Sequence, residues 1–365
     1  MIQSAHIRGF KSLFDVKLEL GRFNVFVGPG GAGKTNVLEA FGLAADGIHR
    51  EGIKEIRLWR RGIRPGAPSR YLSGFSDRGS GAVWIALGDA RGNKRAITIK
   101  PDPGDPVLWS VREKAEAAPG AVDPGAAGGP LEAELLRYGV YALSTPILQG
   151  AYPDPMAGEP LGFSGGNLVD VVTEVLAGPN GRRLENLIEE LIPWSGRPTL
   201  ATPRETHLSQ VVPTRRHVLA LHDRRLAPGH APISAFDAPE SALHALALVS
   251  LALHPNAPPV VAIDSADQAL DAPLALAVVD ELQSLVLADA TRPQMLLTLR
   301  HAAGLDALAL EDERVRLFEV ERLERGDTVV RRISARDAKA LRAGNGGDTL
   351  SAVWTRDGSI NYQPE

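Results

Sequence analysis

The sequence predicts an α/β fold with a mixed, mostly parallel central sheet, and three observations support this class. Residues 23–27 are a continuous apolar run, typical of a strand that is buried on both faces, and a helical pattern follows at 36–45. A second apolar strand at 259–264 precedes a helix at 274–287. A third buried strand at 294–299 then continues the alternation of strands and helices that parallel sheets require.

The composition indicates a globular chain without a dominant surface charge. Of 365 residues, 44% are hydrophobic and 23% are charged, which excludes wholesale disorder. The 40 basic and 44 acidic residues leave a net charge of −4, so any nucleic-acid contact requires a local patch. The absence of cysteine excludes disulfides, thiol nucleophiles and cysteine-ligated metals. No apolar run reaches the ~20 residues of a membrane helix, so we expect a cytoplasmic protein without membrane contact.

We interpret residues 1–365 as a single domain with lobes inserted into its core. The strand patterns around DARGNK, at 82–88 and 95–100, predict an antiparallel β-lobe. The Pro- and Gly-rich stretch Pro101–Pro130 predicts a flexible surface insertion, because no periodic apolar pattern crosses it. The predicted division is a core of 1–50 and 230–310, a β-lobe with the insertion at 51–130, an inserted helical lobe and strand at 131–229, and a C-terminal β-hairpin and tail at 311–365.

The sequence GPGGAGKT, Gly28–Thr35, lies between the first buried strand and its helix. Strand, G-x-x-x-x-G-K-T and helix form the context of a phosphate-binding loop, in which backbone N–H groups and the helix N-terminus face the phosphates. Lys34 would reach the β- and γ-phosphates of ATP, and the Thr35 hydroxyl would ligate Mg²⁺. The predicted nucleotide-binding residues are Gly28, Pro29, Gly30, Gly31, Ala32, Gly33, Lys34, Thr35 and Asn36.

The segment IRGFKSLFDVKLELGRFNVFVGPGGAGKTNVLEAF, Ile7–Phe41, resembles the N-terminus of ABC-type head-domain ATPases, the group of RecF, SMC-like repair proteins and OLD-type ATPases. Gly30 stands where this family usually has Asn. A second segment, GFSGGNLVDVVTEVL at Gly162–Leu176, resembles the short members without a coiled coil. The resemblance implies a P-loop NTPase fold, the ABC ATPase head, with ATP and Mg²⁺ as cofactors.

The resemblance also implies partners. In such heads two subunits sandwich two nucleotides, so we expect a homodimer or a heterodimer. A nuclease or a second ATPase is a further candidate partner. The processes of the family are DNA repair, recombination and defence against phage, and DNA stays open as a ligand.

A P-loop ATPase needs a second acidic strand for its metal. The strand PVVAID ends in Asp264, which we prefer as the residue that holds Mg²⁺; Asp237, in ISAFDAPESALHA, is the alternative. The following sequence DSADQALD resembles the family pattern D-E-P-T-S-A-L-D. This match puts Leu270 and Asp271 on the D-loop, where Asp271 would act on the nucleotide of the opposite subunit.

Three positions depart from the family pattern. Ser265 stands where the family has the Glu that acts as general base, and loss of such a base typically costs ~10²–10⁴ in rate. The switch histidine falls on Arg300, with His301 one position later. The signature region contains Glu240 and no glycine, and a carboxylate there would repel a γ-phosphate. We therefore expect ATP binding with weak hydrolysis; if the protein instead hydrolysed ATP efficiently, Asp267 would be the nearest candidate for the base.

Two functions remain open at this stage. One is a nucleotide-dependent switch in DNA repair or anti-phage defence. The other is a catalytically inactive, nucleotide-binding regulatory or scaffold subunit in a complex with an active ATPase or nuclease. The basic run Arg57, Arg60, Arg61 and Arg64 is interpreted either as a patch that faces DNA or a subunit, or as a solvated helix end.

Overall fold

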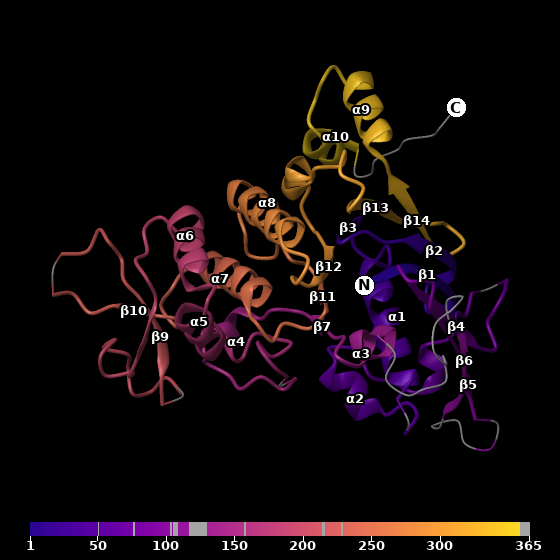
Figure 1. The fold of residues 1–365 in the computed structure, drawn as a ribbon, viewed down its shortest axis with the longest axis horizontal. Helices are drawn as coiled ribbons and strands as arrows, with labels where there is room; N and C mark the ends of the chain where they lie inside the picture. The colour runs from indigo at the N-terminus through magenta and orange to yellow at the C-terminus, as the bar shows by residue number, and fades with distance from the viewer. Residues whose placement is uncertain are drawn as a thin grey trace.

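The computed structural model describes residues 1–49, 51–75, 77–102, 104, 109–116, 130–156, 158–213, 216–227 and 229–357, and in these ranges it has three β-sheets (Figure 1). A lobe that carries β4–β6 and a lobe that carries α5–α7 and β8–β10 extend to opposite sides of the central strands. None of the helices in the described ranges has both the length and the apolar character of a membrane span.

The largest sheet is mixed and mostly parallel, which confirms the predicted fold class. Its strand order is β14-β13-β3-β12-β11-β7, in which all neighbours are parallel except the antiparallel pair β13 and β14. Its strands are β3 (Phe23–Val27), β7 (Val140–Tyr141), β11 (Val260–Ile263), β12 (Gln294–Thr298), β13 (Val315–Arg322) and β14 (Thr328–Ile333).

Both faces of this sheet are covered, which explains the continuous apolar runs of its strands. Successive side chains point to opposite faces, so Val25 and Leu297 enter one core while Phe26 and Leu296 enter another. The ring of Phe26 stacks on that of Phe318 with centroids 4.9 Å apart. The helices that contribute most residues to the first core are α5 (Leu168–Ala177), α6 (Gly181–Leu191), α7 (Glu240–Leu253) and α8 (Ala272–Ala288).

The second core lies between α1 (Lys34–Gly47) and a five-stranded antiparallel sheet of order β2-β1-β4-β5-β6. The predicted hairpin around DARGNK is present as its strands β4 and β5. The strands of this sheet are β1 (Ile2–Phe10), β2 (Leu13–Glu19), β4 (Val83–Asp89), β5 (Lys94–Pro101) and β6 (Trp109–Glu116).

Strand β6 corrects the interpretation of Pro101–Pro130 as an insertion without regular structure. Residues 109–116 pair antiparallel with β5 along its whole length. The sequence concealed this strand because β6 lies at the edge of the sheet, where most side chains are solvent-exposed and the apolar period is weak. The rest of the predicted insertion, at 103, 105–108 and 117–129, lies outside the described residues.

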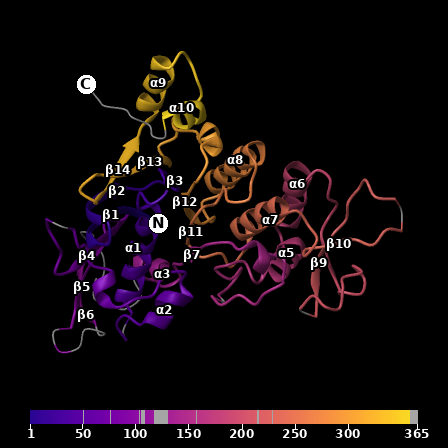
Figure 2. The same ribbon diagram turned by 180° about the vertical axis from the view of Figure 1, so that it is seen from behind.

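The remaining elements complete the lobes. A three-stranded antiparallel sheet of order β10-β9-β8 extends from the helical lobe (Figure 2). Its strands are β8 (Thr199–Ala201), β9 (Val218–Leu221) and β10 (Ile233–Ser234). The other helices are α2 (Glu55–Arg60), α3 (Pro130–Leu136), α4 (Thr145–Leu148), α9 (Ala335–Gly344) and α10 (Leu350–Asp357), with 3-10 turns η1 (Pro68–Arg70) and η2 (Ala303–Ala307).

The sheets do not follow the predicted segment boundaries. Strand β7 belongs to the central sheet although it lies in the segment predicted as an inserted helical lobe and strand. Strand β13 pairs in parallel with β3, so the C-terminal hairpin is part of the core, and the predicted tail contains α9 and α10. Strands β1 and β2 belong to the β-lobe sheet. Such long-range pairings are not visible in local sequence periodicity.

The parallel strands bring three loops to one edge of the central sheet. The loop Gly28–Gly33 follows β3, Asp264 follows β11, and Leu299–His301 follow β12. In open α/β sheets, ligands bind in the crevice at the carboxyl ends of the strands. Thr35 and Asp264, two of the predicted site residues, meet at this edge.

Candidate nucleotide site

The loop Gly28–Gly33 passes from β3 into the N-terminus of α1. Gly33, the residue before the helix, has a φ of 112°, a left-handed conformation that glycine adopts without strain. A Cβ atom built on Gly30 or Gly31 would meet no atom within 4 Å, so the backbone there borders open space. A backbone loop that faces open space at a helix N-terminus can receive an anion.

Lys34 lies under this loop. Its Nζ donates to the carbonyl oxygen of Gly28 and, at 3.1 Å, to that of Pro29. Burial lowers the pKa of Lys34, and the charges of Asp264 and Asp267 oppose that effect. A partly desolvated ammonium group that rests on two carbonyls attracts a phosphate more strongly than a fully solvated one would.

Thr35, the second residue of α1, contacts Asp264 at the end of β11. Thr35 Oγ1 donates to Asp264 Oδ2 at 2.8 Å, and Thr298 Oγ1 donates to Asp264 Oδ1 at 2.6 Å. The structure thus brings Asp264 to the loop. Asp237 instead accepts a hydrogen bond from Ser234 Oγ at 2.7 Å, in the turn before α7.

Ser265 and Arg300 contact one another beside Asp264. Ser265 has a φ of 56°, its N–H donates to Thr298 Oγ1 at 2.7 Å, and its Oγ accepts from Arg300 Nε at 3.0 Å. The guanidinium group of Arg300 therefore lies beside Ser265, the position predicted for the catalytic carboxylate. The Ser265 side chain carries no proton acceptor of carboxylate strength.

Asp267 is only 1% exposed, and both of its carboxylate oxygens accept backbone N–H groups. Its Oδ1 accepts from Arg300 N at 2.8 Å, and its Oδ2 accepts from His301 N at 2.6 Å. Asp267 shapes the loop after β12, and this use of its oxygens argues against the prediction that it replaces the missing base.

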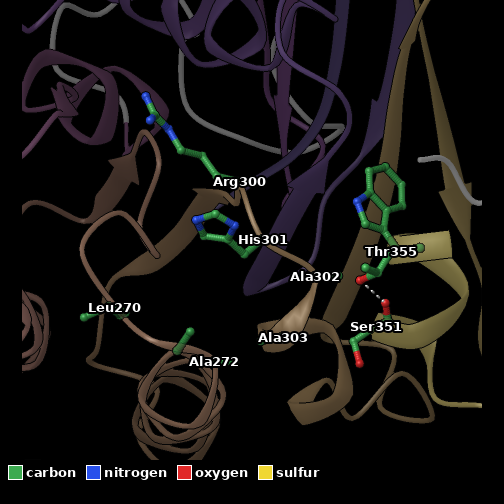
Figure 3. A pocket seen from close by; sticks show the side chains of 10 residues that line it. Leu270, Ala272, Arg300, His301, Ala302, Ala303, Ser351 and Thr355 are labelled. Carbon is green, nitrogen blue, oxygen red and sulfur yellow. Dashed lines mark hydrogen bonds between the residues drawn. The ribbon is translucent and has the colours of Figure 1, made fainter. Parts of the chain in front are cut away.

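Neither His301 nor Asp271 lines the hollow at Gly31–Asn36. His301 lines a hollow between the start of α8 and α10, with Leu270 and Ala272 opposite (Figure 3). Asp271 caps α8, because its Oδ1 accepts from Leu274 N at 2.9 Å. The role of His301 as a switch and that of Asp271 toward a second subunit stay predictions.

Glu240 is the first residue of α7, the helix of the predicted signature region. Thr145 Oγ1 donates to Glu240 Oε2 at 3.0 Å and lies 3.1 Å from His244 Nε2. Burial lowers the pKa of His244. A carboxylate in the first turn already compensates the positive end of the helix dipole, which weakens the attraction of this end for another anion.

The sequence did not identify Arg64 as a site residue, although it lines the same hollow as Gly31–Asn36. Its Nη2 donates to Asn36 Oδ1 at 2.8 Å, and its Nε donates to Glu39 Oε1 at 2.7 Å. Arg64 becomes visible as a site residue only when α1 and the segment after α2 are placed together. Arg322, at the end of β13, lines this hollow as well.

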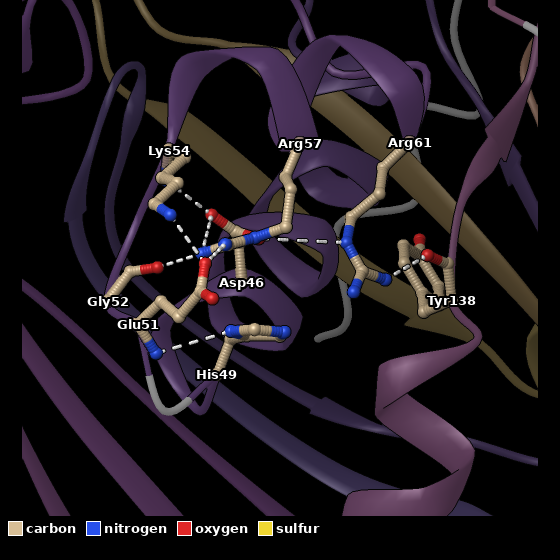
Figure 4. A network of polar contacts seen from close by, with 8 residues as sticks. All are labelled: Asp46, His49, Glu51, Gly52, Lys54, Arg57, Arg61 and Tyr138. Atoms are coloured by element: carbon tan, nitrogen blue, oxygen red, sulfur yellow. Dashed lines mark hydrogen bonds and ion pairs between the residues drawn. The ribbon is translucent and has the colours of Figure 1, made fainter.

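One buried carboxylate on α1, that of Asp46, holds two arginines of the basic run that precedes Arg64 (Figure 4). Asp46, fully buried, accepts from Arg57 Nε at 2.6 Å and lies 3.8 Å from Arg61 Nε. Arg61 also donates to Tyr138 O at 2.7 Å. The side chains of Arg57 and Arg61 are only 19% and 13% exposed, so neither belongs to a free basic patch or to a solvated helix end.

Known structures share this fold. The chain aligns with the Smc head domain with an extended coiled coil from Pyrococcus furiosus, bound to the C-terminal domain of ScpA, at a TM-score of 0.57 and 12% identity over 94% of this chain and 99% of that one. It aligns with an Smc head bound to the C-winged helix domain of ScpA at a TM-score of 0.54 and 13% identity, over 92% and 99% of the chains. The Smc head domain with a coiled coil and joint from Pyrococcus yayanosii gives 0.51 and 10%, over 94% and 99%.

These similarities show that the chain has the fold of an Smc head domain, in agreement with the predicted P-loop NTPase fold. At 10–13% identity they establish the fold alone. No family model matches the sequence, and no curated protein matches it.

The first prediction concerns Glu39, the fully buried acid on α1 that pairs with Lys11 Nζ at 2.5 Å and with Arg64. Glu39→Gln should lower the free energy of unfolding by about 3 kcal/mol at pH 7, the low end for a broken buried pair, because the Arg64 side chain is 62% exposed. Denaturant unfolding measures the change. Glu51→Gln, which removes an exposed partner of Lys54, should change it by under about 0.5 kcal/mol.

The pH dependence gives a second readout of the same substitution. Burial raises the pKa of Glu39, but the hydrogen bonds from Arg64 and the charge of Lys11 outweigh it and hold this pKa below its ordinary value. The stabilisation is therefore complete above the unfolded pKa of about 4.3 and is lost as the pH falls through the folded pKa. The parent and the Gln variant should converge in acid, and equal stabilities at pH 7 would contradict the assignment.

Proposed function

We propose that this protein binds ATP with Mg²⁺ at the loop Gly28–Asn36 and acts as a nucleotide-dependent switch with weak hydrolysis. The observation that carries the proposal is the 2.8 Å contact between Thr35 Oγ1 and Asp264 Oδ2 at the end of a glycine loop that borders open space. By resemblance to the RecF and OLD-like group, the process would be DNA repair or anti-phage defence.

The oxygen atoms at this edge suit magnesium. Mg²⁺ prefers oxygen ligands and is usually held by one or two carboxylates together with substrate phosphates and water. Thr35 and Asp264 supply a hydroxyl and a carboxylate, and the described residues contain no cluster of three or more His, Cys, Asp or Glu that would hold a metal alone. When bound, the ion would neutralise phosphate charge. These residues therefore fit a Mg²⁺ site whose remaining oxygen ligands would come from the nucleotide phosphates and water.

Cationic groups surround the place proposed for the phosphates. Lys34 lies under the loop, Arg64 and Arg322 line the same hollow, and α1 directs its N-terminus there. Opposite charges at short range in a partly desolvated site favour a triphosphate over a neutral ligand. We therefore propose that Lys34 and Arg64 bind the phosphates.

Three features support weak hydrolysis. Ser265 offers no general base, Arg300 contacts Ser265 directly, and Asp267 is occupied by backbone N–H groups. Retention of the nucleotide would then last longer than in an efficient ATPase. A protein of this kind would signal through the bound state and not through turnover.

The second candidate is an inactive regulatory or scaffold subunit that pairs with an active ATPase or nuclease. One observation favours it: Glu240 occupies the first turn of α7 and is held by Thr145. If two heads sandwich nucleotides, this helix end would present a carboxylate to the partner's nucleotide. A heterodimer in which only this chain's own loop binds ATP is then favoured over a symmetric homodimer. Partner proteins such as the ScpA domains bound by the Smc heads are a precedent for further subunits.

Lys34→Ala tests nucleotide binding. Loss of the ammonium group should weaken MgATP binding at least about 100-fold, because hydrogen bonds between charged groups contribute up to about 3 kcal/mol. Isothermal titration calorimetry measures the affinity, and circular dichroism verifies the fold. Lys54→Ala, which removes an exposed lysine, is the matched control and should bind like the parent. Unchanged affinity in Lys34→Ala would refute the assignment of the loop.

Asp264→Asn tests the metal. An asparagine at this position can still hydrogen-bond to the hydroxyls of Thr35 and Thr298, but it lacks the negative charge. The gain in ATP affinity on addition of Mg²⁺ should therefore fall about tenfold or more. Asp237→Asn is the control, because its carboxylate contacts Ser234 in a different turn. Titrations with and without Mg²⁺ decide, and a larger loss in the Asp237 variant would mean that the metal lies elsewhere.

Ser265→Glu tests the missing base. The parent should hydrolyse ATP well below the ~1–10³ s⁻¹ of ordinary enzymes, and a carboxylate at 265 should raise turnover by about 10²-fold. Ser265→Gln has the same length without basicity and should not raise it. A phosphate-release assay compares the three proteins with Lys34→Ala as the background. Fast hydrolysis by the parent that Lys34→Ala abolishes would exclude the proposal of a weak ATPase.

A further inference from the structure

A row of hydrogen bonds lies behind the loop Gly28–Gly33 and joins four separate parts of the chain. Arg64 Nη2 donates to Asn36 Oδ1 at 2.8 Å, and Asn36 Nδ2 donates to Ser12 Oγ at 2.8 Å. Ser12 Oγ and Thr328 Oγ1 are 2.7 Å apart, and Thr328 Oγ1 donates to Ala32 O at 2.7 Å. We call these five residues the relay.

The chemistry of its two ends sets the direction of the relay. An arginine can only donate, so the amide oxygen of Asn36 faces Arg64 and its NH₂ group faces Ser12. A carbonyl can only accept, so the single hydroxyl proton of Thr328 belongs to Ala32 O. The Ser12 hydroxyl then supplies the proton between Ser12 and Thr328. All donors point the same way, and such chains of hydrogen bonds strengthen one another.

The relay is buried where it meets the loop. Thr328 is 2% exposed, Ser12 is 7% exposed and Ala32 is 1% exposed. A Cβ atom on Gly33 would lie 2.4 Å from Thr328 Oγ1 and 2.9 Å from Ser12 Oγ, so the loop backbone rests directly on the two hydroxyls. Without the Thr328 hydroxyl, the carbonyl of Ala32 would be buried without a donor, which is costly.

We propose that Thr328 is a positioning residue for phosphate binding, through which the C-terminal hairpin controls the conformation of the loop Gly28–Gly33. The hydroxyl holds the carbonyl of Ala32 on the protein side, so that N–H groups and not a carbonyl face the phosphates. This inference rests on the proposed function, because it concerns the affinity of the same loop for ATP.

The hairpin adjoins the loop at both ends, which supports this coupling. Before the loop, Val27 pairs with Glu319 of β13, and a Cβ atom on Gly28 would lie 2.1 Å from Val320 O. After the loop, Thr328 begins β14, and its N–H donates to Ser12 O at 2.7 Å. Thr328 is hydrogen-bonded to both Ser12 and Ala32. A shift of β14 along its axis would therefore either move Ser12 or break the hydrogen bond from Thr328 to Ala32. The loop cannot keep its shape while the hairpin moves.

The test compares MgATP dissociation constants of variants at a temperature well below their unfolding transitions. Thr328→Val keeps the shape and removes the donor, and we expect about tenfold weaker binding. Thr328→Ser restores the donor and should bind within about twofold of the parent. Thr173→Val is the matched control: it removes a threonine hydroxyl that donates to Val169 O at 2.7 Å in α5, and it should leave the affinity unchanged.

Hydrogen–deuterium exchange of the nucleotide-free protein separates positioning from general destabilisation. Thr328→Val should accelerate exchange of the amides of 28–35, whereas Thr173→Val should not. Ser12→Ala interrupts the relay one step earlier and should act in the same direction. The Ser12–Thr328 hydrogen bond acts on the loop only through the Thr328–Ala32 hydrogen bond. The double variant Ser12→Ala, Thr328→Val should therefore bind MgATP no more weakly than the Thr328→Val variant.

The outcomes are distinguishable. If the parent binds ATP, Lys34→Ala abolishes binding and Thr328→Val and Ser12→Ala bind like the parent, the relay is overturned while the proposed function stands. If the parent does not bind ATP, the proposed function fails, and unchanged exchange of 28–35 in Thr328→Val overturns the relay as well. Should Thr328→Val fail to fold, normal affinity and normal exchange in Ser12→Ala overturn it.

Discussion

The parallel pairing of β3 between β12 and β13 is the constraint on which the remaining structure depends. It brings the ends of β3, β11 and β12 to one edge, where Thr35, Asp264 and Thr298 contact one another. Polar groups inside the sheet fix this pairing. Asn24, fully buried in β3, donates to Met295 O at 2.9 Å and accepts from Gly21 N at 2.8 Å. A shift in the register of β3 would leave the side-chain amide of Asn24 without its hydrogen-bond partners, so this residue helps to determine which register forms.

Helix α1 extends this constraint from the sheet to the basic segment beside the site. Glu39 and Asp46, seven residues apart on one helix face, are both fully buried. Buried carboxylates require partners, and the segment 51–64 supplies them as Arg57, Arg61 and Arg64. The pairs contribute little net stability over an apolar interface, but removal of one partner is costly. They therefore determine where the segment lies, and with it the guanidinium group of Arg64.

The sequence predicted those parts of the fold and of the site that are local. GPGGAGKT between a buried strand and a helix is a continuous motif, and the chain from β11 to β12 showed clear periods, so the strands β3, β11 and β12 of the central sheet were predicted correctly. Arg64 and Thr328 were missed because their positions depend on contacts across 25 and 296 residues. Strand β6 was missed because an exposed edge strand lacks an apolar period, and β7 because its two residues are too short to show one.

The departures from the family pattern acquire a common physical meaning in the structure. Each polar group that replaces or adjoins a catalytic position already has a partner within the chain: Ser265 has Arg300, Asp267 has two backbone N–H groups, and Glu240 has Thr145. A group that acts as a base or binds a γ-phosphate in the transition state must be free to form new hydrogen bonds at that moment. Here such a group would first have to break existing ones. In the proposed phosphate loop, in contrast, the backbone of Gly30 and Gly31 borders open space. This distribution of satisfied and available groups supports the proposal that the protein binds ATP without efficient turnover.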